Sequence, residues 1–190
     1  MTMFRSDLFK DKRILVTGGG TGLGKEMADE YAKLGAHVYV CGRRGPVVQE
    51  TARELSKAHN ARVTGLECDI RVPDAVDDMM TRIFNEGPLD GLVNNASALA
   101  AGEDEADWDS SYRIDLMHTV RASGLVAPYM ERAGGGAIVH VASTSGMGPG
   151  DNAPYSAMKA AIISHGRVLA QQLGPKGIRV NVVSPGSIDF

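Results

Sequence analysis

Six short runs rich in β-branched residues alternate with longer stretches along this 190-residue chain. Within the longer stretches, apolar residues recur every three or four positions, as Met27, Tyr31 and Leu34 do before Gly35, which predicts amphipathic helices that end at glycine. Strict alternation of strands and helices favours a parallel sheet with right-handed crossovers and helices on both faces. We therefore expect one doubly wound α/β domain over residues 1–190. The predicted strands are 13–17, 37–41, 61–68, 89–94, 137–143 and 178–184.

The longest predicted connection lies between residues 94 and 135, where the pattern indicates one long helix with room for a short one before it. No internal repeat, linker or low-complexity segment interrupts the chain. The sequence therefore gives no sign of a second domain.

Composition and charge exclude several classes of protein. The chain carries 20 basic and 23 acidic residues spread along its length, so a nucleic-acid partner is not expected. The charged N-terminal segment does not resemble a signal peptide, and no apolar stretch reaches the roughly 18 residues of a membrane span, which favours a cytoplasmic location. Cys41 and Cys68 are predicted to be buried reduced thiols. No metal site is predicted, because His118, His140 and His165 lack ligand spacing and are expected to be satisfied core or boundary residues.

The segment TGGGTGLG, residues 17–24, directly follows the first predicted strand and opens a helix. In this context Gly18 permits a tight turn, Gly22 lets the backbone approach a phosphate group, and Gly24 lets the helix pack closely on the strand. The N-terminus of the helix then faces a pyrophosphate. A Walker A loop is excluded, because the final Gly-Lys pair is followed by glutamate rather than Ser or Thr. The alternative interpretation is a flexible glycine-rich turn.

The spacing of this loop, TGxxxGxG, resembles the cofactor loop of the short-chain dehydrogenase/reductase family, whose other motifs follow in the same order. The resemblance covers Thr17 to Gly186 and implies a Rossmann-type fold with sheet order 3-2-1-4-5-6. It also implies a seventh strand after the Pro-Gly motif, for which this chain has no room, so we expect a chain that is C-terminally incomplete. The further motifs are CDI at 68–70, NNA at 94–96, ASTSG at 142–146, YSAMK at 155–159 and SPG at 184–186.

The resemblance implies a catalytic set of Ser143, Tyr155 and Lys159. On a helix, Tyr155 and Lys159 stand one turn apart on the same face. Reduction of a carbonyl leaves negative charge on oxygen, which requires a proton donor and hydrogen bonds placed in advance. We expect the charge of Lys159 to lower the pKa of Tyr155 from about 10, and Lys159 also to bind the nicotinamide ribose. Ser143 would bind the substrate oxygen, with Ser145 as a rival and the capping of a loop as its alternative role.

The end of the second predicted strand indicates the cofactor. An NAD-selective site places an acidic residue there, whereas NADP requires that acid to be absent and an arginine to lie nearby. The sequence reads CGRR, with Gly42 at the acidic position before Arg43 and Arg44, which favours NADP, with NAD as second choice. Two solvated arginines are the alternative. The predicted cofactor-binding residues are Gly18, Thr21, Gly22, Leu23, Gly24, Arg43, Arg44, Asp69, Ile70, Asn95, Ala96, Tyr155, Lys159, Pro185, Gly186 and Ile188.

One position departs from the family pattern. The family often has an asparagine whose backbone carbonyl holds a water molecule near the lysine, and this sequence has Asp115 there, in the segment RIDLMHT. An aspartate presents the same backbone carbonyl, and its carboxylate can stabilise a local bend of the helix. Asp115 is therefore included among the candidate catalytic residues.

These motifs together predict an oxidoreductase that transfers a hydride between NADP(H) and a carbonyl or secondary alcohol. The rival prediction is a sensor or regulatory protein that binds NAD(P) on the same fold without turnover, and the intact catalytic set argues against it. The identity of the substrate is not encoded in any motif. The resemblance also implies a homodimer or homotetramer through the fourth and fifth predicted helices, with apolar surface expected at Leu116, Leu125, Ile162 and Leu169.

Overall fold

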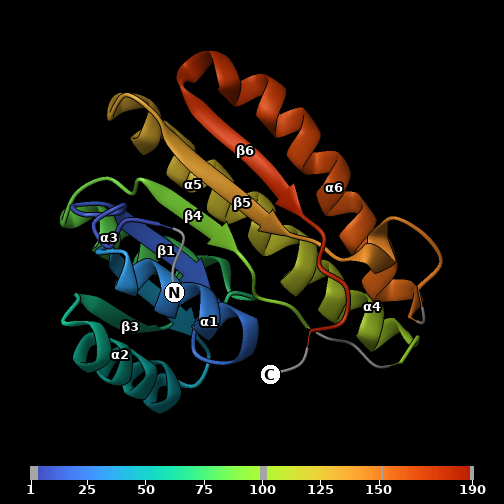
Figure 1. The fold of residues 1–190 in the computed structure, drawn as a ribbon. Coiled ribbons are helices and arrows are strands. Elements are labelled where there is room, and N and C mark those ends of the chain that lie inside the picture. Colours follow the sequence, from blue (N-terminus) through green and yellow to red (C-terminus); the bar gives the residue numbers. More distant parts are fainter. Residues whose placement is uncertain (1–3, 99–101, 151, 189–190) are drawn as a thin grey trace.

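The computed structural model describes residues 4–98, 102–150 and 152–188, and the remainder of the predicted 1–190 domain lies outside the described residues. The described chain forms a six-stranded parallel sheet in the order β3-β2-β1-β4-β5-β6 (Figure 1), which confirms the predicted order. Each strand lies within two residues of its predicted bounds. The strands are β1 (Arg13–Thr17), β2 (His37–Gly42), β3 (Val63–Glu67), β4 (Gly91–Asn94), β5 (Gly136–Val141) and β6 (Ile178–Val183).

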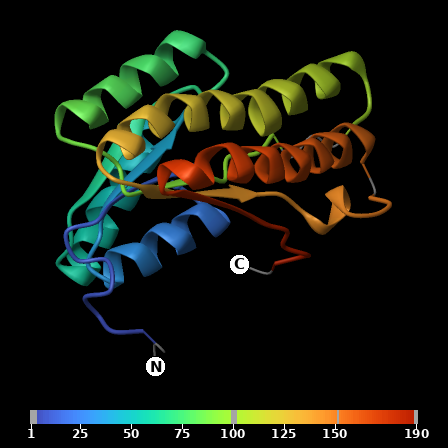
Figure 2. The same cartoon turned by 90° about the horizontal axis from the view of Figure 1, so that it is seen from above.

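Helices cover both faces of the sheet (Figure 2). Because successive strand side chains point to opposite faces, Leu15 packs in the hydrophobic cluster beneath α3 and α5, whereas Ile14 and Val16 pack in the cluster beneath α1 and α2. Burial on both sides explains why the strands read as nearly continuous apolar runs. The helices are α1 (Gly22–Lys33), α2 (Gly45–His59), α3 (Pro73–Asn85), α4 (Glu105–Ser111), α5 (His118–Arg132) and α6 (Ala153–Leu173), with short 3₁₀ helices η2 (Thr144–Gly146) and η3 (Gly174–Lys176).

Glycine ends the helices that lead into β2 and β4, as predicted. Gly35 and Gly87 have φ angles of 92° and 129°, in the region that glycine adopts without steric cost. After α1, the Ala36 amide donates to the Tyr31 carbonyl oxygen at 3.0 Å, which is the hydrogen bond across six residues that defines a Schellman motif. These turns redirect the chain from a helix into the next parallel strand.

The connection between β4 and β5 differs from the prediction. α4, the π-helix η1 (Tyr112–Met117) and α5 follow one another without a break, and residues 99–101 of this connection lie outside the described residues. The run begins at Asp104, whose carboxylate accepts a hydrogen bond from the Asp107 amide at 2.9 Å. Apolar spacing predicted the helix but not its π segment, because six residues are too few for the wider period to show in a sequence pattern.

The prediction of which apolar side chains form the surface of an oligomer is partly wrong. The side chain of Ile162 is only 2% exposed, so it belongs to the core of the monomer. Leu125 and Leu169 are half-buried and pack against the cluster beneath α3 and α5. The large apolar side chains that α5 and α6 do expose are Tyr129 and Val168, at 38% and 50%.

Both cysteines are free and buried, as predicted. Burial raises the pKa of the Cys41 thiol to about 12 and that of Cys68 to about 11. His140 and His165 are less well satisfied than predicted, because one ring nitrogen of each has no hydrogen-bond partner among the described residues. None of the described helices is both long and apolar enough to cross a membrane, and no described group of three or more His, Cys, Asp or Glu residues is arranged to hold a metal ion.

Candidate active site

A cavity of about 780 Å³ opens at the carboxyl ends of the strands, where the strand order reverses between β1 and β4. Doubly wound sheets bind ligands at this position, because the loops on its two sides lead to opposite faces of the sheet. Every predicted catalytic and cofactor-binding residue lines the cavity except Asp115. The fold thus brings the motifs between Gly18 and Ile188 to one place.

The loop between β1 and α1 has the predicted glycine geometry. Gly18 and Gly22 have φ angles of 66° and 51°, which other residues rarely adopt. A Cβ atom at Gly24 would collide with the carbonyl oxygen of Gly18, so a side chain there would push α1 away from the loop. α1 begins at the cavity wall, where a helix N-terminus attracts an anionic group.

The hydroxyl of Thr17 ties the glycine loop to the end of β4. It accepts hydrogen bonds from the backbone amides of Asn95 and Ala96 at 3.0 and 3.1 Å. The side-chain amide of Asn95 donates to the carbonyl oxygen of Thr17 at 2.9 Å. The NNA motif therefore fixes the two central strand ends relative to each other.

Arg43 and Arg44 follow β2, are exposed and line the cavity. Within the described part of the chain, neither guanidinium forms a hydrogen bond or an ion pair, so both are available to an anionic ligand. Asp69 also lines the cavity, but its carboxylate accepts hydrogen bonds of 2.6 to 3.1 Å from the guanidinium of Arg71. This hydrogen bonding is the main reason why the pKa of Asp69 is lowered.

The first turns of α6 present Tyr155 and Lys159 to the cavity. The side-chain oxygen of Asn152 accepts a hydrogen bond from the Tyr155 amide at 2.9 Å and caps the helix, with Pro154 in the first turn. Gly146 of η2 lies against the backbone of Lys159, where a Cβ atom would come within 2.6 Å. The ammonium nitrogen of Lys159 lies 5.3 Å from the centre of the Tyr155 ring.

Ser143 lies two positions after the end of β5 and is buried at the cavity wall. Its hydroxyl oxygen accepts a hydrogen bond from the Ser145 amide at 3.2 Å, so it caps η2, as the alternative interpretation proposed. Its hydroxyl also acts on Tyr155 and works to lower the pKa of the tyrosine. The rival Ser145 does not line the cavity. Ser143 therefore has both the capping role and the position beside the tyrosine.

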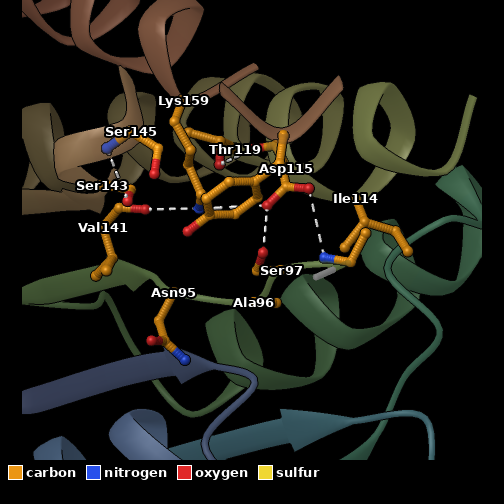
Figure 3. Close-up of polar contacts among 12 residues, drawn as sticks. Asn95, Ala96, Ser97, Ile114, Asp115, Thr119, Val141, Ser143, Ser145 and Lys159 are labelled. Atoms are coloured by element: carbon orange, nitrogen blue, oxygen red, sulfur yellow. Dashed lines mark hydrogen bonds and ion pairs between the residues drawn. The ribbon is translucent and has the colours of Figure 1, made fainter. Parts of the chain in front are cut away.

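The ammonium group of Lys159 is buried between two acceptors (Figure 3). It donates to the carbonyl oxygen of Val141 at 3.0 Å and lies 3.2 Å from Oδ1 of Asp115. The two charged side chains are 2% and 0% exposed. The Asp115 carboxylate also accepts hydrogen bonds from the Ser97 hydroxyl at 2.5 Å and the Ala98 amide at 3.4 Å. Burial lowers the pKa of Lys159, and the negative charge of Asp115 opposes that effect.

The expected lowering of the Tyr155 pKa is wrong for this structure. Burial is the main cause and raises the pKa of Tyr155, Ser143 acts next and lowers it, and the negative charge of Asp115 adds a smaller increase. The expectation failed because it left out the burial of Tyr155, which is the largest cause, and the carboxylate of Asp115, which compensates the charge of Lys159.

Asp115 itself lies in η1, behind the residues that line the cavity. Its carboxylate reaches Ser97 and Lys159 in other elements, so its contacts differ from the helix-bending role predicted for it. Its backbone carbonyl accepts a hydrogen bond from the Thr119 hydroxyl at 3.0 Å. Asp115 therefore contacts Lys159 through its carboxylate, while its backbone carbonyl is bonded to Thr119.

Sequence reasoning missed four residues that shape this site. Thr17 and Ser97 adjoin predicted motifs, and a search for hydroxyl groups next to those motifs would have found them. Arg71 stands two positions after Asp69, where a local ion pair is common. Val141 acts through its backbone carbonyl, for which no side-chain pattern exists.

A doubly wound sheet with a glycine loop at its switch point, and with serine, tyrosine and lysine in the same cavity, defines a dinucleotide-dependent oxidoreductase. Over residues 12–189 the chain matches the family described as short chain dehydrogenase, and it belongs to that family. It is 37% identical over 179 residues to the (2S)-[(R)-hydroxy(phenyl)methyl]succinyl-CoA dehydrogenase subunit of Thauera aromatica, covering 92% of this chain and 72% of the relative.

Two solved structures show the same fold. One is L-sorbose reductase from Gluconobacter frateurii in complex with NADPH and L-sorbose, with a TM-score of 0.90, 30% identity, and coverage of 98% of this chain and 73% of the other. The second is a 7α-hydroxysteroid dehydrogenase in complex with NADH and 7-oxo glycochenodeoxycholic acid, with a TM-score of 0.88, 31% identity, and coverage of 97% and 74%. The chain is an NAD(P)-dependent oxidoreductase, and its glycine cradle and unpaired arginines fit such a cofactor.

Proposed function

We propose that this enzyme transfers a hydride between NADP(H) and a carbonyl or secondary alcohol, with Tyr155 exchanging the proton. The observation that supports this most is the presence of Ser143, Tyr155 and Lys159 in the same cavity as the glycine loop. The nicotinamide of the bound cofactor supplies or accepts the hydride. The protein provides the proton donor, the hydrogen bond to the substrate oxygen and the binding surface.

Each member of the set has one task in this proposal. Tyr155 holds a proton at its hydroxyl and passes it to the oxygen on which charge develops. Ser143, beside it, donates a hydrogen bond to the same oxygen. Lys159 has three N–H donors, of which Val141 and Asp115 occupy two, so one remains for a ribose hydroxyl.

The proposed preference for NADP rests on the two exposed arginines, with NAD as second choice. The acidic residue closest to Gly42 along the sheet is its β3 partner Glu67. Its carboxylate lies against Gly45 at the start of α2, and Glu67 does not line the cavity. A 2'-phosphate would therefore face Arg43 and Arg44 without the carboxylate of Glu67, and the carboxylate of Asp69 in the lining is already bonded to Arg71.

We further propose a small carbonyl or alcohol substrate, a cytoplasmic location, and a homodimer or homotetramer. The fourth and fifth predicted helices correspond to α5 and α6, which expose Tyr129 and Val168. A sensor that only binds the nucleotide is the alternative. The position of Ser143 and Tyr155 in one cavity supports the enzyme, because binding alone requires no proton donor.

The test is oxidation of NADPH, followed by its absorbance, with a panel of ketones and with NADH in parallel. We expect turnover of at least one ketone, with a kcat that Ser143→Ala lowers about 10²- to 10³-fold. Ser145→Ala makes the same change two positions along, outside the cavity, and should stay near the wild-type rate. Binding of NADPH without turnover of any ketone would favour the sensor.

A further inference from the structure

The buried charges nearest Tyr155 form a single ion pair. Lys159 and Asp115 are almost completely buried, and their charged atoms lie 3.2 Å apart. The ammonium nitrogen of this pair lies 5.3 Å from the centre of the Tyr155 ring. An isolated ammonium at that distance would favour a phenolate, but a paired ammonium has its field largely cancelled by the carboxylate.

The other titratable groups near the pair do not replace its charge. His118 is buried next to Lys159, and burial lowers its pKa to about 4, which leaves it neutral near pH 7. His140 on β5 and His165 on α6 also have lowered pKa values because of burial. Glu103 is exposed and accepts a hydrogen bond from the Ala153 amide. The remaining charged residues of η1 and of α4, which packs against α6, are Arg113, Glu105, Asp107 and Asp109.

Opposing influences act on the hydroxyl of Tyr155. The hydrogen bond with Ser143 and the N-terminal position in α6 favour the phenolate. Burial, which is the largest influence, and the carboxylate of Asp115, which is a smaller one, favour the protonated phenol, and the pKa of Tyr155 is raised. Of these four influences, only that of Asp115 can be removed by exchanging a carboxylate for an amide of the same shape.

We propose that Asp115 is a positioning residue that neutralises Lys159 and thereby sets the pH at which Tyr155 changes from proton donor to proton acceptor. The proposal rests on the proposed function, because this change matters to catalysis only if Tyr155 serves hydride transfer. In reduction, the carbonyl carbon gains the hydride of the reduced nicotinamide, its oxygen gains the proton of Tyr155, and the tyrosinate regains a proton from water. In oxidation, the tyrosinate takes the proton of the alcohol while the oxidised nicotinamide gains the hydride.

Asparagine at position 115 would keep a hydrogen-bond acceptor for Lys159 and remove the negative charge. The uncompensated ammonium would then stabilise the tyrosinate and lower the pH at which Tyr155 changes role. At any one pH, the equilibrium constant of the reaction fixes the ratio between kcat/KM for reduction and kcat/KM for oxidation. Asp115→Asn should therefore move the pH profiles of reduction and oxidation together, without favouring one direction.

The first experiment titrates Tyr155 in the free protein by the ultraviolet absorbance of its phenolate, with Tyr155→Phe subtracted. We expect a midpoint above about 10 in the wild type, and a midpoint lower by about 1 pH unit or more in Asp115→Asn. Asp109→Asn is the matched control, because its carboxylate pairs with Arg113 at exposed positions, and its midpoint should equal that of the wild type. Replacing Lys159 with methionine in the Asp115→Asn background should return the midpoint toward the wild-type value.

A wild-type midpoint well below 10, or equal midpoints for the wild type and Asp115→Asn, would overturn the proposal. If Asp115→Asn does not fold, a wild-type midpoint well below about 10 still overturns the proposal. The second experiment records kcat against pH in both directions, where a structural loss would lower both profiles without moving them along the pH axis. If no ketone is turned over, the proposed function fails, while the phenolate titration still tests the role of Asp115.

Discussion

The two ends of the cavity are built on different physical principles. At the nucleotide end, the wall includes the backbone of the glycine loop and two exposed arginines that form no hydrogen bond or ion pair among the described residues. At the catalytic end, Lys159 and Asp115 are buried and form an ion pair with each other. Lys159 also donates to the carbonyl oxygen of Val141, and Asp115 accepts from the hydroxyl of Ser97. Changes at the first end should therefore weaken ligand binding locally, whereas changes at the second should spread through connected groups.

The strongest test of this contrast is Tyr155→Phe. Loss of the hydroxyl removes the proton donor, so kcat should fall about 10²- to 10⁴-fold. The dissociation constant for NADPH, measured by fluorescence titration, should stay nearly unchanged, because the hydroxyl acts when charge develops on the substrate oxygen. Near-normal turnover would show that another group supplies the proton.

Asp115→Ala tests how much the buried pair of Lys159 and Asp115 contributes to the stability of the catalytic end. The substitution leaves the buried ammonium of Lys159 without its counter-charge, and the free energy of unfolding should fall by about 3–5 kcal/mol. Asp77→Ala is the matched control, because Asp77 pairs with Arg121 at partly exposed positions and should cost less than about 1 kcal/mol. Urea unfolding of both variants gives the comparison, and equal losses would contradict a buried network.

The catalytic end should also respond to acid. The pKa of His118 is about 4 in the folded protein, against 6.5 for an unperturbed histidine, so the unfolded chain binds more protons between these values. Stability should be fully present above pH 6.5 and fall as the pH drops toward 4, by on the order of 3 kcal/mol for His118. His118→Gln should flatten the dependence that urea unfolding records, and an unchanged slope would assign the proton uptake to other groups.

The smallest effect is expected at the nucleotide end. Alanine in place of both Arg43 and Arg44 should weaken NADPH about 10- to 100-fold, because the 2'-phosphate loses its charged partners. NADH lacks that phosphate, and its dissociation constant should change little. Arg113→Ala, which removes an exposed arginine already paired with Asp109, should leave both constants unchanged. If the double variant loses equal affinity for NADPH and for NADH, the arginines do not bind the 2'-phosphate.

The fold was predictable because the central strands are buried on both faces and glycines follow α1 and α3, and both features leave local patterns. Gly18 and Gly24 were predictable for the same reason, since the backbone there tolerates no side chain. The contact between Asp115 and Lys159 was not, because it joins two helices and depends on how η1 turns one of them. The pKa of Tyr155 was misjudged because neither its burial nor the charge of Asp115 shows in the spacing of Tyr155 and Lys159. Sequence spacing identifies neighbours within one element but not the charges that another element supplies.

The π-helix at Tyr112–Met117 has a consequence for insertions and deletions. A π segment holds one residue more than an α-helix over the same turn, and each residue advances an α-helix by about 100°. Deleting one residue here would let α4 and α5 merge into a regular helix, yet would rotate one half relative to the other by about that angle. Depending on which half moved, either α4 would lose its contact with α6 or the carboxylate of Asp115 would turn away from Lys159. In a family aligned by its motifs, a gap at this point would therefore mark a change in the charge beside the active-site lysine, even where every motif residue is retained.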